Sequence, residues 1–269
     1  MAGAAQALSG QALLEIEGLA IRFGGLVAVS NFNLGLNPGE LVGLIGPNGA
    51  GKTTVFNMIT GIYRPTAGRI RFEGREMIGL RPDQVVSRGI AWTFQNIRLL
   101  GSLKVIDNVM IAHHFRLRSG PLGAILRVPA YIREEQQMYR NSLELLEAVG
   151  LAHLAEETAG SLPYGEQRRL EIARALATRP KLLLLDEPAA GMNPQETLNL
   201  MSFIQKMRRD FGLTIFLIEH DMQLVMGICE RIVVLDYGNT IAEGTPAEIR
   251  KNPRVIQAYL GVEAGQEGA

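Results

Sequence analysis

The chain has 269 residues, 47% of them hydrophobic and 20% charged, which is enough for a large domain with a sizeable core. Lys and Arg total 27 and Asp and Glu total 27, so no basic excess points to a nucleic-acid partner. The single cysteine, Cys229, excludes a disulfide framework and suits a reducing compartment. The N-terminal residues do not resemble a secretory signal, and no apolar run approaches the roughly 20 residues of a membrane span. We therefore expect a soluble, cytoplasmic chain.

The first third of the chain is predicted to be strands arranged around one glycine-rich loop. Strands are expected over 13–23 and 27–40, where apolar and polar residues alternate with the period of a half-buried sheet. The run 41–45 is wholly apolar, which is typical of a strand buried on both faces. A helix is predicted over 52–62, and 65–77 returns to strand after a turn at Thr66, Ala67 and Gly68.

From about residue 106 to residue 160 the pattern becomes charged, amphipathic and helical. Helices are predicted over 108–120, 133–150 and 151–160, which together suggest an inserted helical lobe.

The α/β pattern then resumes. The runs 181–187 and 213–221 are apolar and end in charged residues, as buried parallel strands do, and ligands bind at the carboxyl ends of such strands. A strand, a turn and a second strand are expected over 231–244, and the C-terminal residues are expected to fray.

The sequence GPNGAGKTT lies between the apolar run 41–45 and the predicted helix, which is the context that a phosphate-binding P-loop requires. Its glycines let backbone N–H groups turn inward around phosphate oxygens, and the helix adds its positive end. Lys52 supplies a cation to the β- and γ-phosphates, and the hydroxyl of Thr53 can ligate Mg²⁺. We therefore predict an ATP site formed by Gly46, Pro47, Asn48, Gly49, Ala50, Gly51, Lys52, Thr53 and Thr54.

A P-loop needs a carboxylate that holds the metal, and Asp186 at the end of the run KLLLLD is placed for that role. The next residue, Glu187, is the candidate for polarising the attacking water. His220 ends a second apolar run and is predicted to position water and γ-phosphate, although a lone histidine there is more often structural. Gln95 lies at the edge of the helical lobe, where it is expected to report the γ-phosphate and metal to that lobe.

These motifs, in this order, resemble the ATP-binding subunits of ABC transporters over roughly residues 14–261. The resemblance implies that Phe23 stacks on adenine, that Gln95 is the Q-loop glutamine and a metal contact, and that Asp186 and Glu187 are the Walker B pair. It makes Asn193 the D-loop position and His220 the switch histidine. The signature segment, which binds the ATP of a partner subunit, would consist of Leu162, Pro163, Tyr164, Gly165, Glu166 and Gln167.

The stretches DEPAAGMNPQET, IRKNPRVIQAYLG and LRSGPLGAILRVPAY are similar to one branch of that family, the LivG-type ATPase of high-affinity branched-chain amino acid importers. The long stretch LIEHDMQLVMGICERIVVLDYGNTIAEGTP is similar to the same branch. The resemblance therefore implies an ATP-hydrolysing subunit that energises the uptake of branched-chain or similar amino acids.

The resemblance also implies the fold. We expect an α/β P-loop NTPase core, a mostly parallel sheet with flanking helices, together with an N-terminal antiparallel β subdomain and an inserted α-helical subdomain. A single ATPase domain would span 14–262, with the core and β subdomain at about 14–94 and 177–262 and the helical subdomain at about 95–176. Residues 1–13 and 263–269 would be flexible tails.

Family resemblance further implies the partners. Such chains work as head-to-tail dimers, here with a second homologous ATPase or with a second copy, and dock on two membrane permeases served by an external binding protein. The chain would then be peripheral on the cytoplasmic face of the bacterial plasma membrane, with ATP and Mg²⁺ as its cofactors. The transported amino acid would not touch it.

Two other functions stay open. An ATPase for lipid or lipopolysaccharide export shares the AAG segment. A non-transport ATPase acting on DNA or ribosomes is disfavoured by the single P-loop, the single cysteine and the absence of sustained heptads. Co-purifying partners would separate these classes.

The signature segment departs from the family pattern Leu-Ser-Gly-Gly-Gln, because Pro163 stands where the serine is expected. Proline has neither a hydroxyl nor an N–H, so the composite ATP site that it completes would be the weaker of two. The alternative is that proline simply suits the first turn of the helix. The direction of the Tyr164 hydroxyl is left open.

Overall fold

The computed structural model describes residues 12–113 and 129–266. These residues fall into two compact units, which we take in turn. Unit 1 lies within Met1–Pro82, Thr214–His220 and Cys229–Ala269, and unit 2 within Asp83–Leu213 and Asp221–Ile228. The subdomain bounds expected from the sequence stay a prediction.

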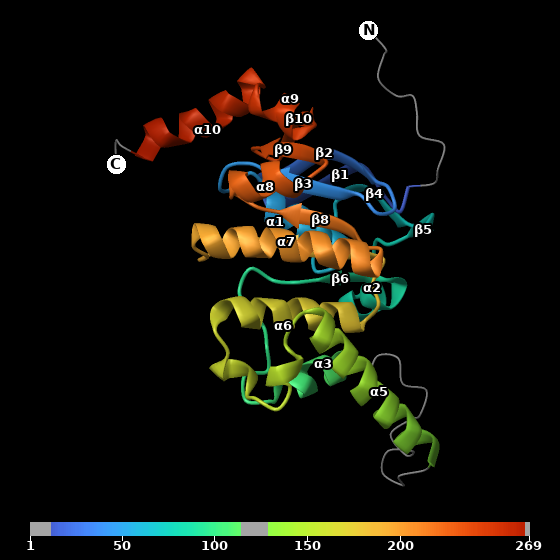
Figure 1. The fold of residues 1–269 in the computed structure, drawn as a ribbon. Helices are drawn as coiled ribbons and strands as arrows, with labels where there is room; N and C mark the ends of the chain where they lie inside the picture. The colour runs from blue at the N-terminus through green and yellow to red at the C-terminus, as the bar shows by residue number, and fades with distance from the viewer. Residues whose placement is uncertain (1–11, 114–128, 267–269) are drawn as a thin grey trace. The chain divides into compact units, whose positions relative to one another are not determined.

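The N-terminal strands of unit 1 form an antiparallel sheet in the order β2-β1-β4-β5 (Figure 1). Their bounds are β1 (Leu14–Phe23), β2 (Leu26–Leu36), β4 (Ala67–Phe72) and β5 (Arg75–Glu76). Phe32, Leu34 and Leu36 are buried, as their alternation predicts. The turn predicted at residues 66–68 is wrong, because β4 begins at Ala67 and the chain turns at Glu73 and Gly74, whose φ angles are 50° and 72°.

The other strands of unit 1 are ordered β10-β9-β3-β8. Their bounds are β3 (Leu41–Ile45), β8 (Thr214–Ile218), β9 (Arg231–Asp236) and β10 (Asn239–Gly244). β3 is parallel to β8 and β9, whereas β10 is antiparallel to β9. Every residue of β3 and β8 is buried, which explains why both read as unbroken apolar runs.

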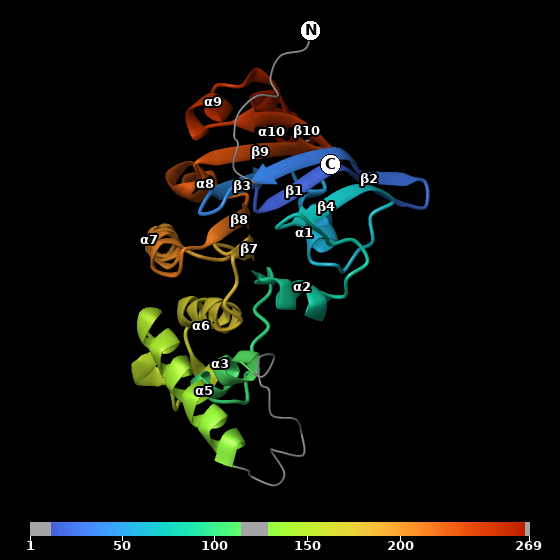
Figure 2. The ribbon, with the colours of Figure 1, turned by 90° about the vertical axis from the view of Figure 1, so that its right-hand side faces the viewer.

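Three helices belong to the described part of unit 1: α1 (Lys52–Ile59), α9 (Pro246–Arg250) and α10 (Pro253–Gln266). Figures 1 and 2 show α9 and α10 beside β10. Helix α10 continues into the segment that was expected to be a C-terminal tail.

Unit 2 contains a parallel pair of strands and most of the helices. The pair is β6 (Ile90–Trp92) with β7 (Leu182–Asp186). The helices are α2 (Pro82–Arg88), α3 (Val105–His113), α5 (Pro129–Ala148), α6 (Tyr164–Ala177), α7 (Pro194–Phe211) and α8 (Met222–Ile228). Helices α3, α5 and α6 pack against one another (Figure 2) around buried residues such as Val109, Leu146 and Leu170. The predicted helical character of this region is therefore confirmed.

Two details of the helical region differ from expectation. Residues 151–160 do not form a helix, because the segment is made of short 3₁₀ turns at Ala152–Leu154 and Ala159–Ser161. Between them Thr158 forms a bridge with Lys104, which leads the chain toward α6. The second half of the helix predicted over 108–120 and most of the stretch LRSGPLGAILRVPAY lie outside the described residues.

Within residues 12–113 and 129–266, no helix is both long enough and apolar enough to cross a membrane.

Candidate functional site

The predicted P-loop connects β3 to α1 in unit 1, as the sequence pattern required. Gly46 has a φ of 152°, and a Cβ on it would lie 2.1 Å from the carbonyl oxygen of Leu235. Gly51 has a φ of 103°, and a Cβ there would lie 2.7 Å from the carbonyl oxygen of Ala28. Glycine is therefore required at both positions by backbone conformation and by close approach of neighbouring strands.

Lys52 is buried and its ammonium group is held inside the loop. Its Nζ donates hydrogen bonds to the carbonyl oxygens of Gly46, at 2.6 Å, and of Pro47, at 3.0 Å. Thr53, the next residue, is exposed in the first turn of α1. The loop thus presents a fixed cation, a hydroxyl and the N–H groups of a helix start, which is the donor set that a triphosphate needs.

The P-loop opens into a cavity of about 710 Å³ within unit 1. This volume lies in the range of small-molecule sites. The cavity is lined by the loop, by the turn between β9 and β10, and by α10, through Pro47, Asn48, Gly49, Ala50, Asp236, Tyr237, Ile241, Arg254, Gln257 and Ala258. The participation of α10 was not anticipated from the sequence.

Two further predicted residues lie in unit 1. Phe23 is exposed at the end of β1, and its ring meets that of Tyr63 edge-on, with centroids 5.3 Å apart. Tyr63 was missed by sequence reasoning, and the pair presents aromatic surface suited to stacking. His220 follows β8 with 56% of its side chain exposed. Its backbone N–H donates to the carboxylate of Glu219, a fully buried residue that the sequence did not single out.

Asp186, Glu187 and Gln95 all lie in unit 2, where Gln95 contacts Glu187. Asp186 ends β7 and is buried. Glu187 follows it with a φ of 44°, a left-handed conformation that is costly for a residue with a side chain and that occurs preferentially at functional sites. The amide Nε2 of Gln95 donates a hydrogen bond of 2.8 Å to the Glu187 carboxylate. Two residues assigned to neighbouring roles from the sequence are therefore in direct contact.

The signature segment leads into α6. Pro163 is the N-cap residue, with extended ψ of 151°, and its carbonyl oxygen accepts hydrogen bonds from the N–H groups of Glu166 and Gln167. The side chain of Gln167 donates back to the carbonyl oxygen of Leu162 at 2.8 Å. The structure is therefore compatible with the interpretation that Pro163 simply suits the start of the helix, because a missing N–H at the N-cap breaks no helical hydrogen bond.

The structure gives the direction of the Tyr164 hydroxyl, which the sequence left open, and adds Arg168, which sequence reasoning did not single out. The Tyr164 hydroxyl donates to the carbonyl oxygen of Ala190, in the segment that follows Glu187. Arg168 has none of its side chain exposed and pairs with Glu171 at 2.7 Å. One signal was available: Arg168 shares the helical spacing of the buried Ile172 and Ala175, so a charge stands on the apolar face.

The fit of Mg²⁺ follows from the donor set. Within the described residues, no group of three or more His, Cys, Asp or Glu side chains converges as a metal cage. An exposed threonine hydroxyl and a single strand-end aspartate are instead what Mg²⁺ uses when phosphate oxygens and water complete its shell. Thr53 in unit 1 and Asp186 in unit 2 each carry an oxygen donor of that kind.

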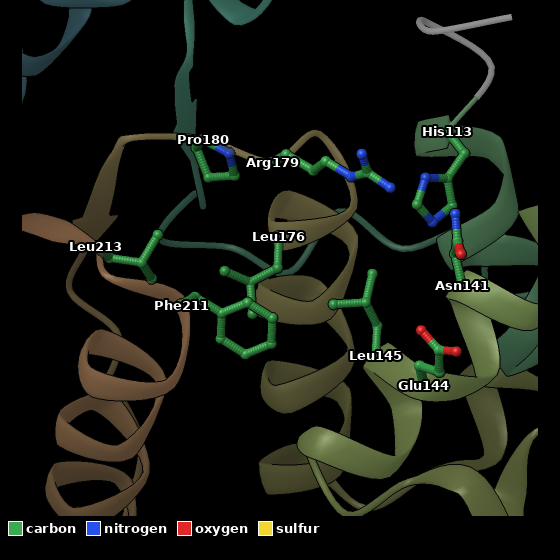
Figure 3. Close-up of a pocket in the computed structure, with 9 residues that line it drawn as sticks. All are labelled: His113, Asn141, Glu144, Leu145, Leu176, Arg179, Pro180, Phe211 and Leu213. Atoms are coloured by element: carbon green, nitrogen blue, oxygen red, sulfur yellow. The ribbon is translucent and has the colours of Figure 1, made fainter.

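Unit 2 also has a cavity of about 460 Å³ that contains none of the predicted ATP-site residues. In Figure 3, Arg179 points toward His113 and Asn141, whereas Leu176, Phe211 and Leu213 line the opposite side. Leu176 is twelve positions after Tyr164, which places the cavity about 18 Å along α6 from the signature segment. This cavity is therefore not part of the predicted site.

Comparisons with known proteins identify the family. Residues 29–190 match the family model described as "ABC transporter", and residues 239–265 match the one described as "Branched-chain amino acid ATP-binding cassette transporter".

Among curated proteins, the chain is 49% identical to the high-affinity branched-chain amino acid transport ATP-binding proteins BraF of Pseudomonas aeruginosa and LivG of Escherichia coli K12, over 93% of this chain and 98% of each relative. It is 37% identical to the lipopolysaccharide export ATP-binding protein LptB of Escherichia coli K12, over 93% of this chain and 98% of the relative.

Solved structures agree. The ADP conformation of MJ1267, an ATP-binding cassette of an ABC transporter, superimposes with a TM-score of 0.82 at 30% identity, covering 94% of this chain and all of that one. A dimeric post-hydrolysis structure of the cassette MJ0796, bound to ADP and Pi, gives a TM-score of 0.71 at 26% identity over 87% of this chain and 98% of that one. The predicted fold class and family are confirmed: the chain belongs to the ATP-binding cassette subunits of ABC transporters, which are transport-coupled ATP hydrolases.

Proposed function

We propose that this chain is the ATP-hydrolysing subunit of an importer that takes up branched-chain amino acids. The observation that carries the proposal is the match of residues 239–265 to the branched-chain family model, because the P-loop and Walker B motifs serve transporters of every substrate class. That segment comprises β10, α9 and most of α10. The identity to BraF and LivG supports the same substrate, and it exceeds the identity to the exporter subunit LptB.

The residues divide the work of hydrolysis as follows. The P-loop and Lys52 hold the triphosphate, and Phe23 stacks on adenine. Thr53, Asp186 and Gln95 would hold Mg²⁺, which would supply positive charge to neutralise the phosphate groups. Glu187 orients and polarises the attacking water, helped by His220, while Lys52 stabilises charge that develops on the phosphoryl group.

The chain acts within an assembly. It pairs head to tail with a second, homologous ATPase or with a second copy, so that each ATP lies between one P-loop and the other signature segment. Two permeases and an external binding protein complete the importer, which places this chain on the cytoplasmic face of the plasma membrane. The γ-phosphate stabilises only the closed pair, so closure and reopening follow the nucleotide state.

Amino acid uptake tests the proposal. The gene is expressed with its neighbouring permease, binding-protein and ATPase genes in bacteria that lack high-affinity uptake of leucine, isoleucine and valine. We expect ATP-dependent uptake of these amino acids, and no uptake when Glu187→Gln replaces the wild-type chain. Failure to restore uptake, with co-purification of lipopolysaccharide-export subunits, would favour export. Capture of ribosomes or a DNA-repair complex would reject transport.

A further inference from the structure

Arg168 connects three functional segments of unit 2 through one buried guanidinium group. Its Nη1 donates to the carbonyl oxygen of Phe94 at 2.7 Å, and its Nη2 donates to the carbonyl oxygen of Gln95 at 2.8 Å. The positive charge is balanced by Glu171, which is 1% exposed and accepts from Nη1 at 2.7 Å. A side chain from α6 therefore holds the main-chain carbonyl groups of Phe94 and Gln95, which lie on either side of the Gln95 Cα atom.

The same guanidinium is also connected, through the Tyr164 hydroxyl, to the turn that follows Glu187. Nη2 of Arg168 donates to the Tyr164 hydroxyl at 3.2 Å, and that hydroxyl donates to the carbonyl oxygen of Ala190 at 3.0 Å. The N–H of Ala190 in turn donates to the carbonyl oxygen of Glu187 at 3.1 Å, closing a turn around the carboxylate-bearing residue. Glu187 is thus approached from Gln95 on one side and from Ala190 on the other.

We propose that Arg168 and Tyr164 are positioning residues for ATP hydrolysis. Arg168 sets the place of Gln95, and Tyr164 sets the place of the turn that carries Glu187, so both depend on where the start of α6 lies. Because the signature segment is the start of α6, a displacement of that segment disturbs the contact between Gln95 and Glu187. Only a planar guanidinium offers two donors in a fixed geometry to adjacent carbonyl oxygens, which a lysine ammonium does not reproduce.

The first variant is Tyr164→Phe, which removes one hydroxyl and keeps the ring. Tyr164 is 43% exposed, so the change leaves no buried cavity. In the full-length chain, assayed with the subunits that co-purify with it, we expect kcat for ATP to fall about 10-fold, the size of one lost hydrogen bond in a transition-state alignment. The melting temperature should stay the same. The matched control Tyr139→Phe, another exposed tyrosine, should leave kcat unchanged. An unchanged kcat in Tyr164→Phe would overturn the proposal.

A double-mutant cycle with Gln95→Ala tests whether Arg168 and Tyr164 affect kcat through the contact between Gln95 and Glu187. If Arg168 and Tyr164 act by placing Gln95 and Glu187 together, Arg168→Lys and Tyr164→Phe should each lower kcat less than about twofold once Gln95 is alanine. Full, additive losses in that background would instead mean that the two residues act only on folding or on the partner's ATP, and would reject the positioning role. Because the readout is ATP turnover, this test is independent of which substrate the transporter carries.

Discussion

The side-chain amide of Gln95 donates a hydrogen bond of 2.8 Å to the carboxylate of Glu187, although 92 residues separate the two in the sequence. Glu187 makes this contact from a left-handed backbone conformation with a φ of 44°. Such a conformation costs roughly 1–3 kcal/mol and persists only where neighbouring structure enforces it. Here the turn between Glu187 and Ala190, closed by a backbone hydrogen bond of 3.1 Å, supplies that enforcement.

Glu187→Gln should separate ATP binding from ATP hydrolysis. The substituted amide still accepts from Gln95 through its oxygen, so the local structure is retained, but the charge that polarises water is lost. We expect kcat to fall by about 100-fold or more while ATP binding persists and a closed dimer accumulates. Turnover assays and size-exclusion chromatography with ATP measure both effects. Glu147→Gln, on the exposed face of α5, is the control, and undiminished turnover in Glu187→Gln would reject the role.

Lys52→Ala should weaken nucleotide binding itself. The buried ammonium that now bonds to the carbonyl oxygens of Gly46 and Pro47 is lost, and with it one charge-assisted contact to phosphate. Such a contact contributes about 1.5–3 kcal/mol, so the Kd for ATP should rise about 10- to 100-fold in equilibrium binding measurements. Lys251→Ala, at an exposed position that ends α9, should bind ATP as the wild type does. Equal affinities in the two variants would contradict the assignment of Lys52.

Gly46→Ala should destabilise the fold as well as the P-loop. The added Cβ would lie 2.1 Å from the carbonyl oxygen of Leu235, so β9 or the loop must shift. Overpacking of this kind costs about 1–3 kcal/mol, which lowers the melting temperature by roughly 3–10 °C in a chain of this size. Gly35→Ala is the matched control, because a Cβ there meets no atom within 4 Å. Equal thermal stability of the two variants would show that the loop can relax freely.

Pro163→Ser distinguishes the two interpretations of the signature segment. Serine at this N-cap position can accept a hydrogen bond from the N–H of Glu166, which stabilises a helix by about 0.5–2 kcal/mol. It also restores the hydroxyl that would face the partner's γ-phosphate. If both ATP sites matter, the assembled complex should change its rate of ATP turnover or the stability of its closed dimer. A rise in melting temperature with unchanged turnover would mean that Pro163 serves only the start of α6.

The local sequence pattern predicted the structure correctly where burial or backbone conformation restricts which residue types can occur. The apolar runs at 41–45 and 213–221 became the fully buried strands β3 and β8, because burial on both faces leaves no polar alternation to obscure them. The P-loop could be predicted from its glycines because few other residue types adopt a backbone conformation with positive φ. The predictions at residues 66–68 and 151–160 are wrong. Small residues at 66–68 predict a turn, but β4 begins at Ala67, and helix-favouring residues at 151–160 predict a helix, but the chain forms short 3₁₀ turns.

The motif order thus sufficed for the family and for ATP as the nucleotide, since both depend on residue type and on spacing along the chain. The contact of Gln95 with Glu187, the hydrogen bond from Tyr164 to Ala190, and the burial of Arg168 between them came only from the folded chain. The reason is physical: each joins segments distant in sequence, and whether a hydroxyl or guanidinium finds a carbonyl oxygen there depends on side-chain direction and on how α6 packs, which no periodicity records.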